Sequence, residues 1–260
     1  VQRQTDCQAG HVSQSITVAC ERSKPLQVEK IVAFHSSFDH AISEPTLAAR
    51  DTILKAADFE TLRQSHELSW AHLWNHADID LQNSSPETQF ILRLHIFHLL
   101  QTTSVNTIDR DVGVPSRGWH GEAYRGHVFW DELFIFPFLN LRIPELTRSL
   151  LAYRFRRLVE ARYAARQAGY VGAMFPWQSG SSGREESQRL HLNPKSGRWI
   201  PDVSHLQWHV NSAIAYNVWQ YHQVTRDLEF LQFYGAELIL EIARFWSSVA
   251  TLNEARGRYE

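Results

Sequence analysis

Residues 121–138, "GEAYRGHVFWDELFIFPF", join an ionisable, aromatic stretch to a strongly apolar one. The change of character falls at Trp130–Asp131, and Leu133 opens the apolar half. Carboxylates are favoured at the N-terminus of a helix, where backbone N–H groups lack partners. The stretch therefore predicts a helix from about Trp130, with its apolar part packed in a wall and its polar start at a rim.

Helical patterns continue on both sides of this stretch. Upstream of it, apolar residues recur at helical spacing over about 86–101, and 104–126 has the glycines and prolines of a loop. Further helices are predicted at 46–58, 61–76, 145–168, 205–224 and 228–250. The last of these is apolar nearly all round, which indicates a buried inner helix.

A long interval from Gly169 to about Ser204 separates two of these helices and is rich in glycine, proline and aromatic residues. A loop of that length inside a domain is usually functional or disordered, and its aromatic residues argue against disorder. Successive helices with elaborate alternate loops suit a toroid of paired helices, in which the ends of inner helices surround a central pit.

The N-terminal part reads differently. Residues 11–20 alternate as a strand and 26–34 read as a second strand, followed by a helical connector. Two strands alone are marginal, so they are expected to finish a sheet that starts upstream. The first residues, "VQRQTDCQ", contain neither a methionine nor an apolar signal core, and the chain reads as a piece of a longer one.

Charge and cysteine content narrow the class of protein. The net charge of -2 gives no electrostatic reason to expect a nucleic-acid or anionic-membrane partner, and no apolar run is long enough to predict a membrane span. Cys7 and Cys20 are too few for a disulfide framework, which favours a cytoplasmic location.

Several residues could carry chemistry. Asp131 is either an ordinary helix cap or a carboxylate that accepts sugar hydroxyls, with Trp130 as a flat wall against a pyranose; His127 and Arg125 are close enough to share the pit. The loop "GAMFPWQSGSSGREE" (172–186) adds Trp177 and uncharged hydrogen-bonding groups, or is a plain surface loop. Its Glu185 and Glu186 are interpreted as an exposed acidic pair rather than catalytic carboxylates.

His205 and His209 lie four residues apart in a predicted helix, a spacing that suits a zinc pair. No H-E-x-x-H pattern and no third ligand accompany them, so no metal is predicted. His209 is interpreted either as a group that reaches into a sugar pocket or as a satisfied core histidine.

Four motifs together resemble glycoside hydrolase family 65, the family of maltose, trehalose and kojibiose phosphorylases and a few hydrolases. They are G-E-A-Y-R-G-H-V-F-W-D (121–131), G-A-M-F-P-W-Q-S (172–179), A-Y-N-V-W-Q-Y (215–221) and Y-G-A-E-L-I-L-E-I-A-R-F-W (234–246). The resemblance implies a mainly α fold: residues 85–260 would form the first part of an (α/α)6 barrel, 41–84 a helical linker and 1–40 the last strands of a β-sandwich.

The resemblance also implies inverting cleavage of an α-linked glucose disaccharide. In phosphorolysis inorganic phosphate attacks the anomeric carbon, so no other cofactor is expected, whereas an inverting hydrolase needs a second carboxylate to activate water. The general acid, a glutamate, is expected downstream of Glu260, so no catalytic residue is assigned and this chain alone is expected to be inactive. The implied substrate-binding residues are Trp130, Asp131, Trp177, His209, Arg125 and His127.

Some positions depart from the family pattern. The family's W-D-T-E reads Trp130-Asp131-Glu132-Leu133 here, its E-x-H reads Gln207-Trp208-His209, and the segment 189–201 is unlike the best-known phosphorylases. These departures leave the acceptor sugar open, and with it the choice between phosphorolysis and hydrolysis. The sequence is also compatible with a non-catalytic sugar-binding protein and with a purely structural helical scaffold. A homodimer is possible on family grounds.

Overall fold

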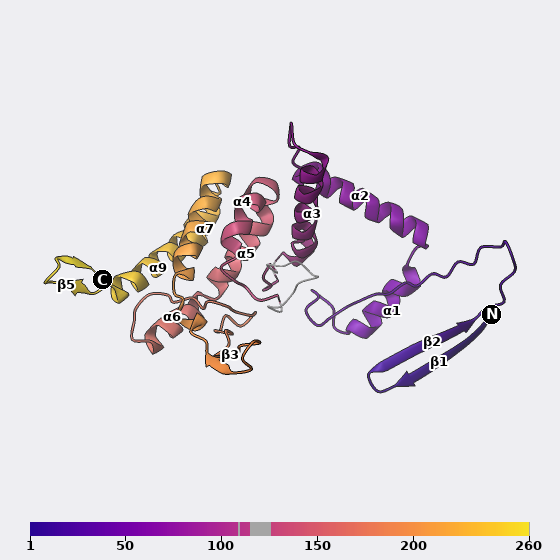
Figure 1. Ribbon diagram of the computed structural model, residues 1–260, viewed down its shortest axis with the longest axis horizontal. Coiled ribbons are helices and arrows are strands. Elements are labelled where there is room, and N and C mark those ends of the chain that lie inside the picture. Colours follow the sequence, from indigo (N-terminus) through magenta and orange to yellow (C-terminus); the bar gives the residue numbers. More distant parts are fainter. Residues whose placement is uncertain (109, 115–125, 260) are drawn as a thin grey trace. The chain divides into compact units, whose positions relative to one another are not determined.

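We describe the protein from a computed structural model that covers residues 1–108, 110–114 and 126–259 (Figure 1). The chain divides into two compact units, Val1–Ala71 and His72–Glu260. Helices dominate the described residues, and strands occur only as three two-stranded ribbons. The predicted mainly α class is therefore confirmed.

The first unit begins with an antiparallel hairpin of β1 (Gln2–Gln8) and β2 (His11–Thr17), which turns at Gly10 with a φ of 74°. Helix α1 (Pro45–Lys55) follows, and α2 (Phe59–Ala77) leads out of the unit. The Glu44 carboxylate accepts a hydrogen bond from the Thr46 N–H at 3.2 Å and so caps α1.

The strand predicted at residues 26–34 is wrong, because these residues form no strand. Residues 2–8 pair with β2 instead. They have no apolar alternation, so their pairing depends on the glycine turn that brings them back along β2. A prediction based on alternating apolar residues cannot detect such a strand.

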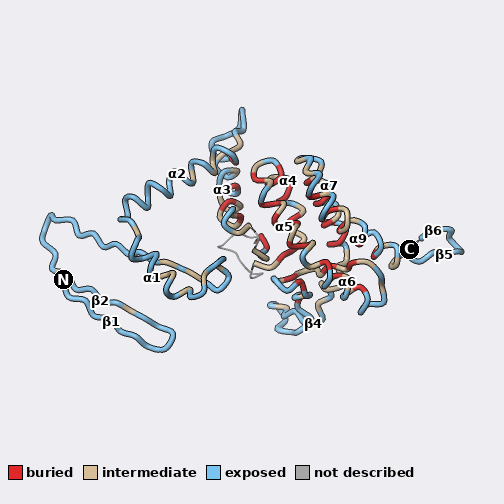
Figure 2. The backbone as a smooth tube through the Cα atoms, turned by 180° about the vertical axis from the view of Figure 1, so that it is seen from behind, coloured by how far each residue is buried: buried red, intermediate tan, exposed pale blue. Residues whose placement is uncertain are grey.

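The second unit is built on helices. Helix α3 (Pro86–Thr102) starts at Ser85, whose hydroxyl accepts from the Thr88 N–H at 3.1 Å. Helices α4 (Glu132–Arg142), α5 (Pro144–Arg156) and α7 (Val210–Thr225) pack against one another and lie side by side in Figure 1. Most of the buried residues belong to these helices and the loops next to them (Figure 2).

The helix predicted at 145–168 is divided into α5 and α6 (Leu158–Gln167). The break is at Arg157, where φ is -103° and ψ is 15°. The Arg157 side chain leaves the helices there to contact Asp111 and the backbone of Ser181. The break in the helix therefore allows Arg157 to connect the α5–α6 junction with Asp111 and with the loop at Ser181.

The helix predicted at 205–224 starts later, at Val210. A 3-10 turn, η2 (Ser204–Leu206), precedes it and contains His205, whereas His209 stands at the N-terminal boundary of α7. The two histidines are therefore not on one helix face, which removes the geometric basis of a zinc pair.

The helix predicted at 228–250 consists of α8 (Leu228–Phe230), a π-helical turn η3 (Leu231–Gly235) and α9 (Ala236–Val249). Gly235 lets this segment approach α7, because a Cβ there would lie 2.8 Å from Cγ1 of Val218. Among the described residues only one face of α9 is buried, and Leu240 is 63% exposed. The predicted burial of this helix is therefore found on one face of α9 only.

The interval between α6 and α7 is ordered and tied to the helices. Gly172 (φ 76°) passes so close to α9 that a Cβ would lie 2.3 Å from the Glu241 carbonyl oxygen, and the Ala173 N–H donates to that oxygen at 3.0 Å. A hairpin of β3 (Leu190–Leu192) and β4 (Trp199–Pro201) interrupts it. The last ribbon pairs β5 (Leu252–Asn253) with β6 (Arg258–Tyr259).

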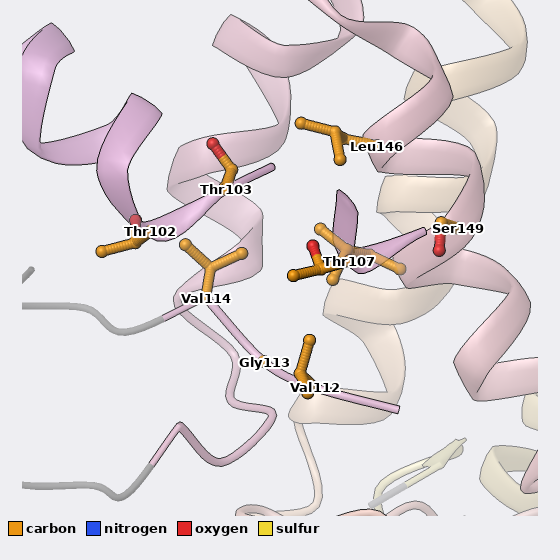
Figure 3. A pocket seen from close by; sticks show the side chains of 9 residues that line it. Thr102, Thr103, Thr107, Val112, Gly113, Val114, Leu146 and Ser149 are labelled. Atoms are coloured by element: carbon orange, nitrogen blue, oxygen red, sulfur yellow. The ribbon is translucent and has the colours of Figure 1, made fainter. Parts of the chain in front are cut away.

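A small cavity lies where the end of α3, the 3-10 turn η1 (Val105–Thr107), residues 112–114 and α5 meet (Figure 3). Its volume is about 10 Å³, room for about one water molecule and far too little for a sugar. It is lined by Thr102, Thr103, Thr107, Val112, Gly113, Val114, Leu146, Ser149 and Leu150. The cavity is a packing defect beside the core rather than a substrate site.

Within the described ranges, no helix combines the length and the apolar character that crossing a bilayer requires.

Candidate functional site

Asp131 occupies the N-cap position of α4 without capping it. Its side chain makes no hydrogen bond to the first N–H groups of the helix. Its backbone is helical, with φ -53° and ψ -23°, whereas a capping aspartate usually has an extended backbone. The interpretation of Asp131 as an ordinary cap is therefore wrong, and its carboxylate is left for another partner.

The environment of Asp131 is partly apolar. The residue is half-buried, and burial raises the pKa of its carboxyl above the ordinary value. Trp130 precedes it, and the Trp130 ring packs edge-on against Phe134 one turn into α4, with the centroids 5.2 Å apart. A half-buried carboxylate beside an indole is thus fixed at the start of a core helix.

Trp177 comes from the interval between α6 and α7, yet it lies against Trp130. The two ring centroids are 5.4 Å apart and the ring planes differ by 30°. Phe129 packs edge to face with Trp177, with the ring centroids 5.9 Å apart. Two indoles that are distant in sequence therefore form one aromatic surface next to Asp131.

His209 completes the cluster from a third segment. Its ring centroid lies 5.8 Å from that of Trp130 and 5.1 Å from that of Trp177, and the residue is exposed. It is therefore not a satisfied core histidine. The site of Trp130, Asp131, Trp177 and His209 is hereafter called the aromatic site.

His127 contacts the residue that follows Trp177. Its Nδ1 is 2.6 Å from Nε2 of Gln178, and its neighbour Val128 exchanges backbone hydrogen bonds of 2.7 and 3.1 Å with Ser179. Arg125, the remaining predicted substrate-binding residue, lies outside the described residues. The structure thus brings together four of the six predicted residues, and it places His127 against Gln178, the residue that follows Trp177.

Glu185 is part of the support of the site. It is only partly exposed, and its carboxylate accepts from three backbone N–H groups: Trp177 at 2.7 Å, Gln178 at 3.3 Å and Ser187 at 2.9 Å. The predicted exposed acidic pair is therefore wrong for Glu185. Glu186 is exposed, and its nearest cation is Arg184 at 3.5 Å.

Tyr153 and Arg157, from α5 and the α5–α6 junction, form hydrogen bonds with the loop that follows Trp177. The Tyr153 hydroxyl lies 2.9 Å from the Ser179 hydroxyl and donates to the Gly180 carbonyl at 2.6 Å. Burial raises the pKa of this phenol, so it remains a donor at neutral pH. Arg157 donates from Nε to the Ser181 carbonyl at 2.6 Å.

A buried ion pair lies below Trp130 and Asp131. Arg154 on α5 donates from Nη2 to the Glu132 carboxylate at 3.0 Å and to the Phe129 carbonyl at 3.4 Å. Their exposed fractions are 1% for Arg154 and 3% for Glu132. Complete burial raises the pKa of Glu132, and the guanidinium opposes that shift. Arg154 thus contacts both neighbours of the Trp130–Asp131 pair, through the backbone of Phe129 and the side chain of Glu132.

Sequence patterns did not reveal these supporting residues. Tyr153, Arg154 and Arg157 stand in an ordinary basic helix pattern, and only their buried contacts distinguish them. The sequence around Arg157 continues the helical pattern and gives no signal of the break. Among the described residues, no three His, Cys, Asp or Glu side chains gather as a metal-binding group.

The role of Glu185 gives a first prediction. In Glu185→Gln the amide NH₂ must face at least one backbone N–H, whichever way it is turned, so the Trp177 loop loosens. We expect trypsin to cleave faster after the exposed Arg189. Glu186→Gln is the matched control. Equal behaviour of the two variants would show that Glu185 does not hold the loop.

Comparison with known proteins identifies the family of both units. The glycosyl hydrolase family 65 central catalytic domain matches residues 93–260, and the N-terminal domain of the same family matches residues 1–73. A solved structure of a candidate kojibiose phosphorylase from the human microbiome superposes with a TM-score of 0.65 at 23% identity, over 84% of this chain and 28% of its own. The chain thus shares the fold of part of that protein.

Curated relatives extend the match. An uncharacterized glycosyl hydrolase of Mycobacterium tuberculosis (strain CDC 1551 / Oshkosh) is 50% identical over 94% of this chain and 18% of its own length. A trehalose 6-phosphate phosphorylase of Lactococcus lactis is 37% identical over 95% of this chain and 32% of its own length. A kojibiose phosphorylase of Halothermothrix orenii is 36% identical over 90% of this chain and 31% of its own length. The chain therefore spans about a fifth to a third of the length of these relatives.

Proposed function

The chain belongs to glycosyl hydrolase family 65, and from this premise we propose that its protein cleaves an α-glucosidic disaccharide with inversion, by phosphorolysis to β-glucose 1-phosphate. The observation that carries the proposal is the aromatic site: two indoles and a histidine from three segments lie against one another, and the residue next to Trp130 is Asp131, whose half-buried carboxylate caps no helix. The names of the trehalose 6-phosphate and kojibiose phosphorylases among its relatives support phosphorolysis.

Each residue of the aromatic site receives a role in this proposal. Trp130 and Trp177 present flat apolar faces to one glucose ring, in the position before the bond that breaks. Asp131 accepts hydrogen bonds from the hydroxyls of that glucose; charged acceptors make strong hydrogen bonds. His209, which is exposed and lies beside both indoles, is assigned to the acceptor side. His127 and Arg125 are assigned to the glucose pocket as well.

The rest of the reaction is assigned to residues outside this chain. We assign the general acid to a glutamate downstream of Glu260 and keep phosphate as the attacking co-substrate, with no other cofactor. Residues 1–40, 41–84 and 85–260 are proposed as the end of a β-sandwich, a linker and the first part of an (α/α)6 barrel. A homodimer and a cytoplasmic location belong to the same proposal.

The test is incubation of the complete protein with trehalose, trehalose 6-phosphate, maltose, kojibiose and nigerose, each with and without phosphate. Release of β-glucose 1-phosphate from one of them, only when phosphate is present, is expected. Release of free glucose without phosphate would replace the proposal by an inverting hydrolase, which needs a second carboxylate. Binding of a disaccharide without any turnover would identify a non-catalytic sugar-binding protein.

A further inference from the structure

Asn211 lies in the first turn of α7 and is fully buried, with an exposed fraction of 0%. Its side-chain amide uses both ends. Oδ1 accepts from the Phe175 N–H at 2.8 Å, and Nδ2 donates to the Trp208 carbonyl at 2.7 Å. A buried amide with both ends satisfied is rigid, because losing either bond leaves an unpaired polar group away from water.

The two segments held by Asn211 are those that carry Trp177 and His209. Phe175 precedes Trp177 by two residues, and Trp208 is the direct neighbour of His209. The Asn211 backbone N–H also donates to the Trp208 carbonyl at 3.0 Å, so backbone and side chain of Asn211 both fix the turn before α7. One side chain therefore connects the donor-side and acceptor-side halves of the aromatic site.

The surroundings leave little freedom for the Phe175 end. The Ala173 N–H donates to α9 through the Glu241 carbonyl at 3.0 Å, and the Met174 N–H donates to α6 through the Ala161 carbonyl at 3.0 Å. Proline follows at 176 and has no N–H. The bond to Asn211 adds a hydrogen bond to the ring contacts of Tyr170 with Trp208 and of Trp177 with His209, and so ties this loop to the first turn of α7.

We propose that Asn211 is a positioning residue that sets the spacing between Trp177 and His209, and thereby the distance between the glucose position and the acceptor position. This inference rests on the proposed function of the aromatic site. The competing explanation is a buried amide that contributes only to stability. The two explanations predict different results. A residue that only stabilises the fold changes the free energy of unfolding, whereas a positioning residue also changes the binding of one sugar more than that of the other.

The test compares Asn211→Ala and Asn211→Asp with Asn217→Ala in the complete protein. Asn217 is the matched control: it is on the same helix, 2% exposed, and its Oδ1 has no hydrogen-bond partner in the described part of the chain. We expect Asn211→Ala to lower kcat/KM for the disaccharide about 10- to 100-fold, since small misplacements in a site are costly. Asn217→Ala is expected to change it less than 2-fold, at temperatures where all variants are folded by circular dichroism.

Asn211→Asp separates the two bonds and keeps the side-chain volume. An ionised aspartate still accepts from Phe175 but loses the side-chain bond to the Trp208 carbonyl, so the His209 half keeps only the backbone bond from Asn211 at 3.0 Å. In the synthetic direction we expect the KM for the acceptor sugar to rise at least 5-fold, while the KM for β-glucose 1-phosphate changes less than 2-fold. Equal changes in both constants, or losses in Asn211→Ala that Asn217→Ala matches, would overturn the proposal.

An NMR measurement that needs no catalysis tests the inference independently of the proposed function. The centroid of the His209 ring lies 5.8 and 5.1 Å from those of two indoles, so its ring-proton NMR signal, assigned with His209→Gln, should be displaced by their ring currents. Asn211→Ala is expected to return the signal towards its ordinary position, and Asn217→Ala to leave it unchanged. An unmoved signal in Asn211→Ala would refute positioning, whatever the protein catalyses.

Discussion

Replacement of Asp131 by asparagine is expected to lower kcat/KM for glucosyl transfer at least about 100-fold while the fold loses no stability. The proposed role gives the carboxylate hydrogen bonds to sugar hydroxyls, and such bonds can supply several kcal/mol in the transition state of glycoside cleavage. Asparagine keeps the shape of the side chain but loses its charge. Activity assays of the complete protein measure the loss.

The stability half of this prediction follows from the pKa of Asp131. Burial raises the pKa of its carboxyl in the folded state above the unfolded value. Such a group favours the folded state at low pH, and that contribution is lost as the pH rises through the unfolded and then the folded pKa. At neutral pH the ionised Asp131 therefore costs stability, and asparagine removes that cost.

The free energy of unfolding of Asp131→Asn, measured with urea at pH 7, should equal or exceed that of the wild type. Its advantage over the wild type should shrink as the pH is lowered. Glu145→Gln is the control, because Glu145 is an exposed acid in the first turn of the neighbouring helix α5. Normal activity of Asp131→Asn would remove Asp131 from the site, and a large loss of stability would show a structural role.

Replacement of Arg154 by methionine is expected to have the largest effect on stability, a loss of about 3–5 kcal/mol in the free energy of unfolding. That is the usual cost of breaking a buried ion pair from one side, because the remaining charge is left without a partner. Here Glu132 would keep its buried carboxylate and the Phe129 carbonyl would lose its donor.

The pair itself need not be stabilising. Two charges removed from water rarely recover their desolvation cost, and apolar replacements of both partners are often neutral. The double variant Glu132→Leu with Arg154→Met should therefore recover most of the stability lost in Arg154→Met alone. Urea unfolding of both variants is the measurement, with the exposed Arg184→Met as control. No recovery in the double variant would mean that the lost contacts of Arg154, and not the unpaired charge, set the cost.

The aromatic site illustrates how far a sequence can be interpreted. Tryptophan beside aspartate at a helix start, and tryptophan after Phe-Pro in a long loop, are local patterns that also belong to a recognisable family. Through that resemblance both tryptophans were predicted to bind one substrate, and the structure places their ring centroids 5.4 Å apart. Their roles in sugar binding stay predictions.

The supporting residues could not be predicted in the same way. Asn211 and Glu185 form hydrogen bonds with backbone groups of other segments. Every residue type except proline has a backbone N–H, so the sequence does not indicate which residues will be the partners. The limits of the helices were missed for a related reason. Arg157 and the π turn before α9 depart from regular helix because of tertiary contacts, and these override local propensity.

The most direct test of the central claim is a crystal structure of the complete protein with glucose bound. The account predicts a pyranose ring in van der Waals contact with Trp130 or Trp177 and a sugar hydroxyl within hydrogen-bonding distance of the Asp131 carboxylate. Glucose bound away from these three side chains, or a site that other residues close off from it, would contradict the account.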